Sequence, residues 1–191
     1  MITTRKELKE AISLDRTRYN YSLKSYIIGL ILKRDSSHAV RLLTALRKTE
    51  YYYNNKGKGL WNKVMYAIYK VKYSRLQNKY DTYIFLNCVK PGLWIPHMGG
   101  VIVNCLSMGY NCSVNKGVVI GNKKGQQNRA IIGDNCYFTL GCKVIGKVNI
   151  GDNAVVCQNS VVVKDVPRNT IVSGVPAKVI KTFSNIDDIN I

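Results

Sequence analysis

A six-residue repeat governs the second half of this 191-residue chain and leaves few folds open to it. Between residues 132 and 167 the sequence divides into six consecutive hexads, and the string IGDN recurs after 18 residues. The first positions are large and apolar: Ile132, Phe138, Val144, Ile150, Val156 and Val162. The fifth positions are small or β-branched: Cys136, Cys142, Val148, Ala154, Ser160 and Val166. With Gly, Asn and Asp at the corners, this pattern predicts a parallel β-helix with three hexads in each coil.

The same spacing continues upstream with one fault. Apolar residues lie six apart from Val89 to Val101 and, after a slip of one residue, again from Met108 to Ile120. The polar segment 121–131 follows, and its run GNKKGQQNRA offers no inward side chain, so we expect a loop that protrudes from the coil.

The chain therefore divides into regions of different chemistry. We expect a basic, Tyr-rich helical region at residues 1–82, a β-helix domain at residues 83–181 that carries the loop, and a tail at residues 182–191. The predicted fold class is mainly β, a parallel β-helix with an α-helical N-terminal region.

Positive charge is concentrated in the first of these regions. The whole chain has a formal net charge of +18, and residues 1–80 hold 18 Lys and Arg against 5 Asp and Glu, with ten of the 13 Tyr. Nucleic acid, an anionic membrane surface and a solvated helical face with aromatic anchors are the three interpretations. The basic residues are interspersed and no nucleic-acid-reading module is present, so we expect no nucleic-acid partner. A weak association with anionic membranes stays open.

The first residues and the apolar runs bear on location. Charges occupy the start, MITTRKELKEAISL, where a signal peptide needs an apolar stretch, and the apolar run from Tyr26 to Leu32 is too short to span a bilayer. These features predict a cytoplasmic protein.

Cysteine and histidine limit the chemistry. Cys105, Cys112, Cys136 and Cys142 occupy fifth positions, where Cys packs as a compact hydrophobe, and there is no CxxC spacing. With two His in the chain, a zinc site of the three-histidine kind is excluded, and we expect no metal.

One histidine is a candidate for catalysis. His97 occupies an outward position just before Gly99 and Gly100, which leave backbone and space uncovered. An imidazole that titrates near neutrality on a rigid strand suits a general base. His38 lies in the helical region, where a partly exposed surface role is the simpler interpretation.

Several motifs in succession carry a family resemblance: IPHMGGVIVN, GNKKGQQNR, IGDNCYFTLGCKVIGKVNIGDNAVV and VVVKDVPRNTIVSGVPAKVIK. Over residues 84–181 the chain resembles the serine acetyltransferase-like branch of the hexapeptide acyltransferases. The leader, with LRKTEYYYNNKGKG, is similar to that of short members associated with polysaccharide biosynthesis. The resemblance implies a left-handed β-helix, a homotrimer, and acetyl-CoA as acyl donor in a groove between neighbouring coils.

The resemblance also implies roles for single residues. His97 matches the catalytic histidine, which takes a proton from the acceptor hydroxyl. The cofactor positions are Leu140, Gly141, Gln158, Val163, Lys164, Gly174, Lys178 and Lys181. The three lysines among them suit the anionic phosphates of CoA.

Departures from the family pattern lie on the acceptor side. Pro96 and Arg129 stand where the L-serine-specific enzymes have an Asp and a second His, and the expected upstream carboxylate falls on Thr82, with Asp81 one step off. We therefore predict acceptor binding by Arg129 and Asp81, and an orienting group for His97 of another kind, such as a backbone carbonyl. The predicted activity is O-acetyl transfer to a hydroxyl of a small acceptor, a sugar or glycan precursor, with L-serine as the alternative. An alternative of another class is a basic scaffold that docks the β-helix onto a membrane or a partner.

Overall fold

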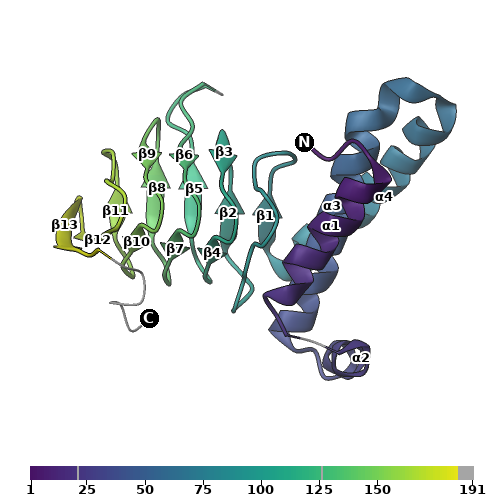
Figure 1. The fold of residues 1–191 in the computed structure, drawn as a ribbon, viewed down its shortest axis with the longest axis horizontal. Helices are drawn as coiled ribbons and strands as arrows, with labels where there is room; N and C mark the ends of the chain where they lie inside the picture. Colours follow the sequence, from purple (N-terminus) through teal and green to yellow (C-terminus); the bar gives the residue numbers. More distant parts are fainter. Residues whose placement is uncertain (21, 126, 185–191) are drawn as a thin grey trace.

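A computed structural model of the chain describes residues 1–20, 22–125 and 127–184, and it has two joined parts (Figure 1). Four helices form the N-terminal part, and short parallel strands wound into a coil form the rest. The last helix ends at Tyr80 and the first strand begins at Thr82. One apolar cluster of buried residues extends from the helices into the coil, and the division into domains stays a prediction.

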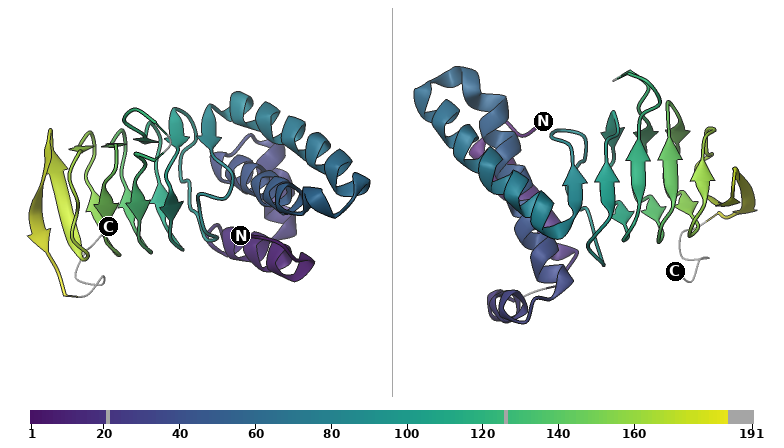
Figure 2. Two further views of the ribbon diagram at one scale, coloured as in Figure 1. Left: turned by 90° about the horizontal axis from the view of Figure 1, so that it is seen from above. Right: turned by 180° about the vertical axis from the view of Figure 1, so that it is seen from behind.

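The helices form a compact group at one end of the coil (Figure 2). They are α1 (Arg5–Thr17), α2 (Leu23–Ile31), α3 (Asp35–Asn55) and α4 (Leu60–Tyr80), with a 3₁₀ turn, η1 (Lys56–Lys58), between the last two. A capping box starts α1: the Glu7 N–H donates to Thr4 Oγ1, and Glu7 Oε2 accepts from the Thr4 N–H. Backbone N–H groups of Thr3 and Thr4 lower the pKa of Glu7 to about 2. None of the described helices combines the length and apolar character needed to cross a membrane.

Tyrosines join α3 to α4. Tyr52 stacks on Tyr69 with ring centroids 5.3 Å apart, and Tyr53 lies 5.4 Å from Tyr66. Deeper in the interface the buried Tyr73 hydroxyl donates to the Ile84 carbonyl at 2.7 Å, which ties α4 to the first strand. The tyrosine-rich character of the helical region therefore serves helix packing on this face.

A buried ionic cluster joins the helices to the coil. Arg47 of α3 is 1% exposed, and its Nε lies 2.8 Å from Asp15 Oδ2 of α1, while its Nη1 lies 3.0 Å from Glu50 Oε2. The same guanidinium donates to the backbone carbonyls of Val89 at 2.7 Å and Lys90 at 3.1 Å, both in the first coil. Burial raises the pKa of Glu50, although Arg47 opposes the shift.

The coil has three faces, each a sheet of stacked strands. The first sheet contains β1 (Thr82–Ile84), β2 (Val101–Val103), β5 (Val119–Gly121), β8 (Lys143–Ile145) and β11 (Val161–Val162). The second contains β3 (Ser107–Met108), β6 (Ile131–Ile132) and β9 (Asn149–Ile150). The third contains β4 (Ser113–Val114), β7 (Tyr137–Phe138), β10 (Val155–Val156), β12 (Thr170–Gly174) and β13 (Ala177–Thr182). All pairs are parallel except β12 with β13.

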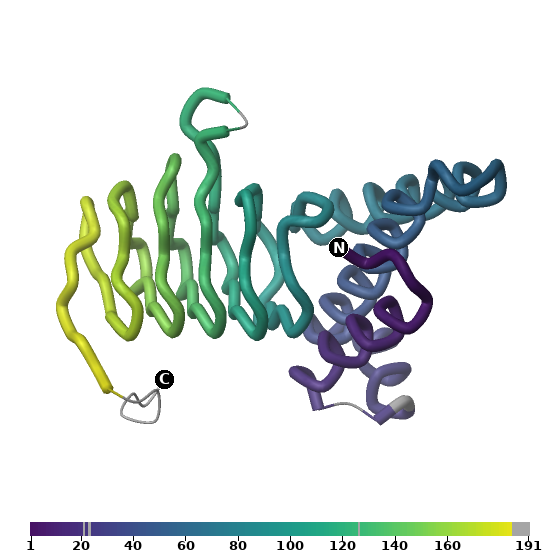
Figure 3. The backbone as a smooth tube through the Cα atoms, turned by 45° about the horizontal axis from the view of Figure 1, so that its top comes forward, coloured from purple at the N-terminus to yellow at the C-terminus, as the bar shows by residue number. Residues whose placement is uncertain are grey.

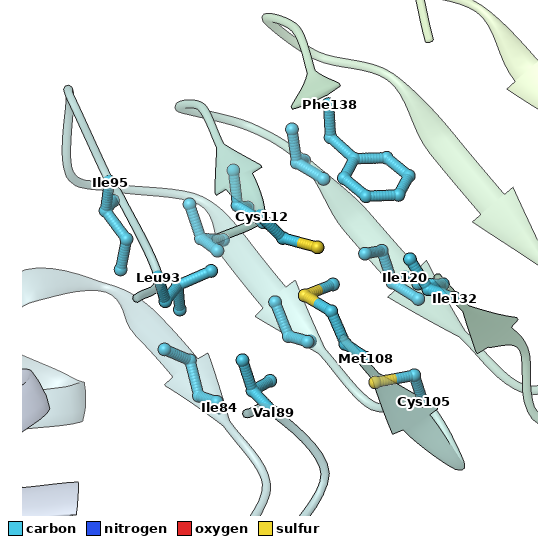
Figure 4. Packing of buried hydrophobic residues seen from close by; sticks show 14 of the residues in the cluster. Ile84, Val89, Leu93, Ile95, Cys105, Met108, Cys112, Ile120, Ile132 and Phe138 are labelled. Atoms are coloured by element: carbon cyan, nitrogen blue, oxygen red, sulfur yellow. The ribbon is translucent and has the colours of Figure 1, made fainter. Parts of the chain in front are cut away.

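The hexad register is confirmed by burial. Every first and fifth position from Ile132 to Val166 is at most 5% exposed, and the side chains of successive coils stack inside (Figure 4). All six Cys are free thiols, and five of them are buried. Burial raises the pKa of the Cys142 thiol to about 12, which suits a packing role.

The recurrent IGDN string has a structural reason at one corner of the coil. Asn135 and Asn153 adopt left-handed φ angles of 56° and 59°, a conformation that Asn tolerates. The preceding aspartates bond the adjacent coil: Asp134 Oδ1 accepts from the Tyr110 N–H at 2.7 Å, and Asp152 Oδ1 accepts from the Asp134 N–H at 2.9 Å. The corner side chains therefore fasten each coil to the next.

The polar segment stands out from the coil, as predicted, in its described parts (Figure 3). Its bounds differ from the prediction, because Gly121 pairs in β5 and Ile131 pairs in β6. Strand partners lie 18 residues apart from Lys143 to Val161 but 24 apart from Val119 to Lys143, so the protruding segment adds the length of one hexad. Of the predicted tail, residues 185–191 lie outside the described residues.

Candidate active site

A column of stacked corners runs along the edge between the third and the first sheet. From the helical end to the far end its corners are Gly99–Gly100, Lys116–Gly117, Leu140–Gly141, Gln158–Asn159 and Gly174. The bonds between successive corners are Gly117 N–H to Gly99 O (2.9 Å), Gly141 N–H to Lys116 O (3.0 Å), Asn159 N–H to Leu140 O (2.9 Å) and Gly174 N–H to Ser160 Oγ (3.1 Å). We call this feature the corner column.

Glycine residues allow successive corners of the column to stack closely on one another. Gly141 has a left-handed φ of 69°, and a Cβ there would lie 2.4 Å from Asn159 Oδ1. Gly117 likewise has a φ of 73°, and its Cβ would meet the Gly141 backbone at 3.5 Å. Because the corners carry few side chains, backbone groups line the surface of the column.

His97 lies at the helical end of the corner column, two residues before Gly99. Its side chain is 64% exposed, and its Nδ1 lies 3.6 Å from Oδ2 of Asp35, the first residue of α3. The separation is that of an ion pair and is longer than a hydrogen bond. The group that faces the His97 ring is therefore a carboxylate, and the predicted backbone carbonyl is not the partner that the structure shows. Sequence reasoning missed Asp35 because it lies 62 residues earlier, in another element.

Asp81 and Thr82 support the turn that follows His97. Asp81 Oδ2 accepts from the Gly100 N–H at 2.8 Å, and Thr82 Oγ1 accepts from the Gly99 N–H at 3.3 Å. Asp81 also ends α4 in a left-handed conformation. The structure thus places Asp81 in contact with the backbone of the site, and acceptor binding by its carboxylate stays a prediction.

Arg129 lies at a different corner. It is half-buried, and its Nη1 donates to the Cys105 carbonyl at 3.3 Å, beyond the end of β2, whereas Gly99 and Gly100 precede β2. Four residues of extended chain from Val101 to Cys105 span about 13 Å. Within a single copy of the chain, Arg129 therefore does not reach the ring of His97.

The predicted cofactor residues also divide between corners. Leu140, Gly141, Gln158 and Gly174 belong to the corner column. Val163 and Lys164 follow β11, at the opposite end of the first sheet, while Lys178 and Lys181 lie on β13. Leu140 is 46% and Val163 is 48% exposed, so both offer apolar surface outside the coil.

Lysines accompany the corner column along its length. Lys116 is exposed at one corner, Lys143 Nζ donates to the Gly117 carbonyl, and Lys178 lies beside Ser173 at the far end. Such a row of cations suits an extended anionic ligand. Among the described residues no group of three or more His, Cys, Asp or Glu is arranged to hold a metal ion.

The three-sided coil and its stacked corners define the class of this protein. It is a hexapeptide-repeat β-helix protein with a helical N-terminal part. No family model matches the chain. Over 92 residues it is 36% identical to a serine acetyltransferase of Staphylococcus aureus (strain Mu50 / ATCC 700699), a match that covers 47% of this chain and 43% of that protein. The chain thus spans less than half the length of that relative.

Solved structures share the fold. A Neisseria gonorrhoeae serine acetyltransferase in complex with serine matches with a TM-score of 0.68 and 23% identity, over 93% of this chain and 70% of that one. A serine acetyltransferase in complex with CoA matches with a TM-score of 0.68 and 18% identity, over 92% of this chain and 71% of that one. The coil is therefore serine acetyltransferase-like in sequence, and the fold, helices included, is that of serine acetyltransferases. The resemblance predicted from the motifs is confirmed.

Proposed function

We propose that the chain is an acetyl-CoA-dependent O-acetyltransferase with His97 as its general base. The observation that carries this proposal is an exposed imidazole, faced by a carboxylate, at the end of a backbone-lined column with lysines along it. The sequence match to serine acetyltransferases supports the same chemistry.

His97 has the position for proton transfer. With Asp35 on the Nδ1 side of the ring, Nε2 is the nitrogen that would accept the proton of an acceptor hydroxyl during acetyl transfer. The same nitrogen would return the proton to the departing thiolate. A backbone N–H of the neighbouring corners is the natural donor to the oxyanion.

The corner column fits the acyl donor. Amides at successive glycine corners suit a long pantetheine arm, because no side chain of those residues covers the backbone. Leu140 offers apolar contact at the third corner, and Lys178 and Lys181 on the terminal hairpin suit the phosphates. Acetyl-CoA would supply the activated acetyl group.

A homotrimer would complete the site. Since Arg129, Val163 and Lys164 lie across the first sheet from the corner column, they would reach it only from a neighbouring copy. Trimer formation and the left-handed winding are therefore parts of the proposal, drawn from the resemblance. In such a groove one copy would contribute His97 and the other Arg129.

For the acceptor we propose a sugar or glycan-precursor hydroxyl. Pro96 and Arg129 replace the residues that L-serine-specific enzymes use, and a guanidinium can bind a sugar acid as well as an amino-acid carboxylate. L-serine is the second candidate, favoured by the match to an enzyme solved in complex with serine.

A direct assay separates the two acceptors. The purified chain is given acetyl-CoA with L-serine, nucleotide-activated sugars or lipid-linked sugars, and the loss of the thioester absorbance is followed. This readout avoids thiol reagents, which would react with the half-exposed Cys157. We expect turnover with a sugar acceptor. Rapid formation of O-acetylserine would overturn the sugar preference, and no transfer to any hydroxyl would overturn the enzyme assignment.

A positioning role is predicted for Asp35. In Asp35→Asn the ring keeps a neighbour of the same shape, but the imidazolium that forms during proton transfer loses a negative charge beside it. We expect kcat to fall about tenfold while the KM for acetyl-CoA stays unchanged, because the carboxylate stabilises the imidazolium that forms only during proton transfer. Steady-state kinetics that separate kcat from KM measure this, with Glu10→Gln on α1 as the control. An unchanged kcat would show that Asp35 has no part in catalysis.

A further inference from the structure

Helix α4 has a second apolar face that nothing in the described chain covers. Its first face packs on α3 through the tyrosines described above. The exposed residues on the other side are Leu60 (77%), Trp61 (70%), Val64 (44%), Ile68 (54%) and Val71 (52%). Positions 60, 64, 68 and 71 follow helical spacing, so they form one stripe, which we call the α4 stripe. Figure 2 shows α4 along the outside of the helical region.

All the charged residues of α4 are cations. Between residues 56 and 80 there are seven Lys and Arg and no Asp or Glu. At 100° per residue, Lys63 and Lys70 flank the stripe on one side and Lys72 and Lys79 on the other, and all four are exposed. An apolar stripe between two rows of lysines is the pattern of a helix that lies in the plane of an anionic membrane interface.

Trp61, the second residue of α4, lies beside the α4 stripe and has the same preference for an interface. Among the described residues, Trp61 has the most exposed aromatic side chain. Indole rings favour the headgroup level of a bilayer. We propose that the α4 stripe docks the protein onto the surface of a membrane that contains anionic lipids. The proposal is independent of acetyl transfer and says where the chain works.

The positive charge of α4 favours an anionic membrane over a second copy of the chain as the partner of the α4 stripe. A symmetric contact through α4 would bring two sets of lysines together without an acidic residue on either helix to offset them. An anionic headgroup layer attracts each lysine near its surface by about 1 kcal/mol. The apolar residues then enter the headgroup boundary and add their burial to this attraction.

The test uses the full chain and vesicles of phosphatidylcholine alone or mixed with phosphatidylglycerol. We expect co-sedimentation with the mixed vesicles and little with the neutral ones. Lys63→Gln with Lys70→Gln removes two of the flanking charges and is expected to weaken binding about 25-fold. Val64→Glu places a carboxylate in the stripe and is expected to weaken it more than tenfold. Leu14→Glu on α1 is the matched control, because Leu14 is as exposed as Val64, at 44%.

Fluorescence supplies a second readout at the stripe itself. The chain has two Trp, so in Trp94→Phe the emission comes from Trp61, and we expect it to shift to the blue when anionic vesicles are added. Circular dichroism shows that each variant is folded. Equal binding to neutral vesicles, or binding that Val64→Glu leaves unchanged, would overturn the proposal. So would a chain that ignores vesicles but dissociates into smaller species when Val64→Glu is introduced, because the stripe would then be a contact between copies.

Discussion

His97→Ala is expected to remove acetyl transfer while CoA affinity stays nearly unchanged. The imidazole touches the reacting groups in the proposed site, whereas the corner column that would bind CoA is built from backbone and does not depend on it. General-base catalysis by a positioned side chain contributes about 10² to 10⁴ in rate. Loss of the thioester absorbance measures transfer, and isothermal calorimetry measures the affinity for CoA.

The second histidine supplies the control for that experiment. His38 stacks on Tyr80 with ring centroids 4.6 Å apart, and burial followed by the charge of Lys79 lowers its pKa. It belongs to the helix packing, so His38→Ala should keep its turnover number. Retained turnover in His97→Ala would instead show that another group acts as the base.

Arg47→Met is expected to lower the free energy of unfolding by about 3 to 5 kcal/mol, because it leaves the carboxylates of Asp15 and Glu50 buried without their cation. The variant also frees the carbonyls of Val89 and Lys90. Urea denaturation followed by circular dichroism measures the change. Arg41→Met, an exposed position on the same helix, should stay within about 0.5 kcal/mol of the parent. Equal stability of the two variants would mean that solvent reaches the cluster.

The repeat made the coil predictable from sequence. Inward residues such as Ile132 and Cys136 recur at a fixed spacing, and a shift by one residue would expose them all, so the sequence alone determines which side chains form the core. The corners of the coil could be predicted equally well, because Asn and Gly are among the few residues that adopt a left-handed backbone conformation. The slip before Met108 and the loop after Ile120 were visible as breaks in the same pattern.

The candidate site was predictable only where it follows that repeat. The positions of His97 and Gly141 could be predicted because both residues lie at defined points of a hexad, and their roles stay proposals. Asp35 was not, since its approach to His97 depends on how α3 packs against the first coil, which no local pattern encodes. The distance between Arg129 and the corner column was also hidden, because residues of one motif set can lie on different corners of a three-sided coil.

The antiparallel strand β13 has a consequence for solubility. In a stack of parallel strands, the last coil has an edge of unpaired backbone N–H and C=O groups. A coil of another molecule can pair with this edge and extend the stack. At the third sheet β13 runs against β12 from Thr170 to Gly174 and occupies that edge with a strand of the wrong direction for another coil. At the opposite end the helices occupy the equivalent position. End-to-end stacking of separate molecules is thus opposed by β13 at the third sheet and by the helices at the opposite end.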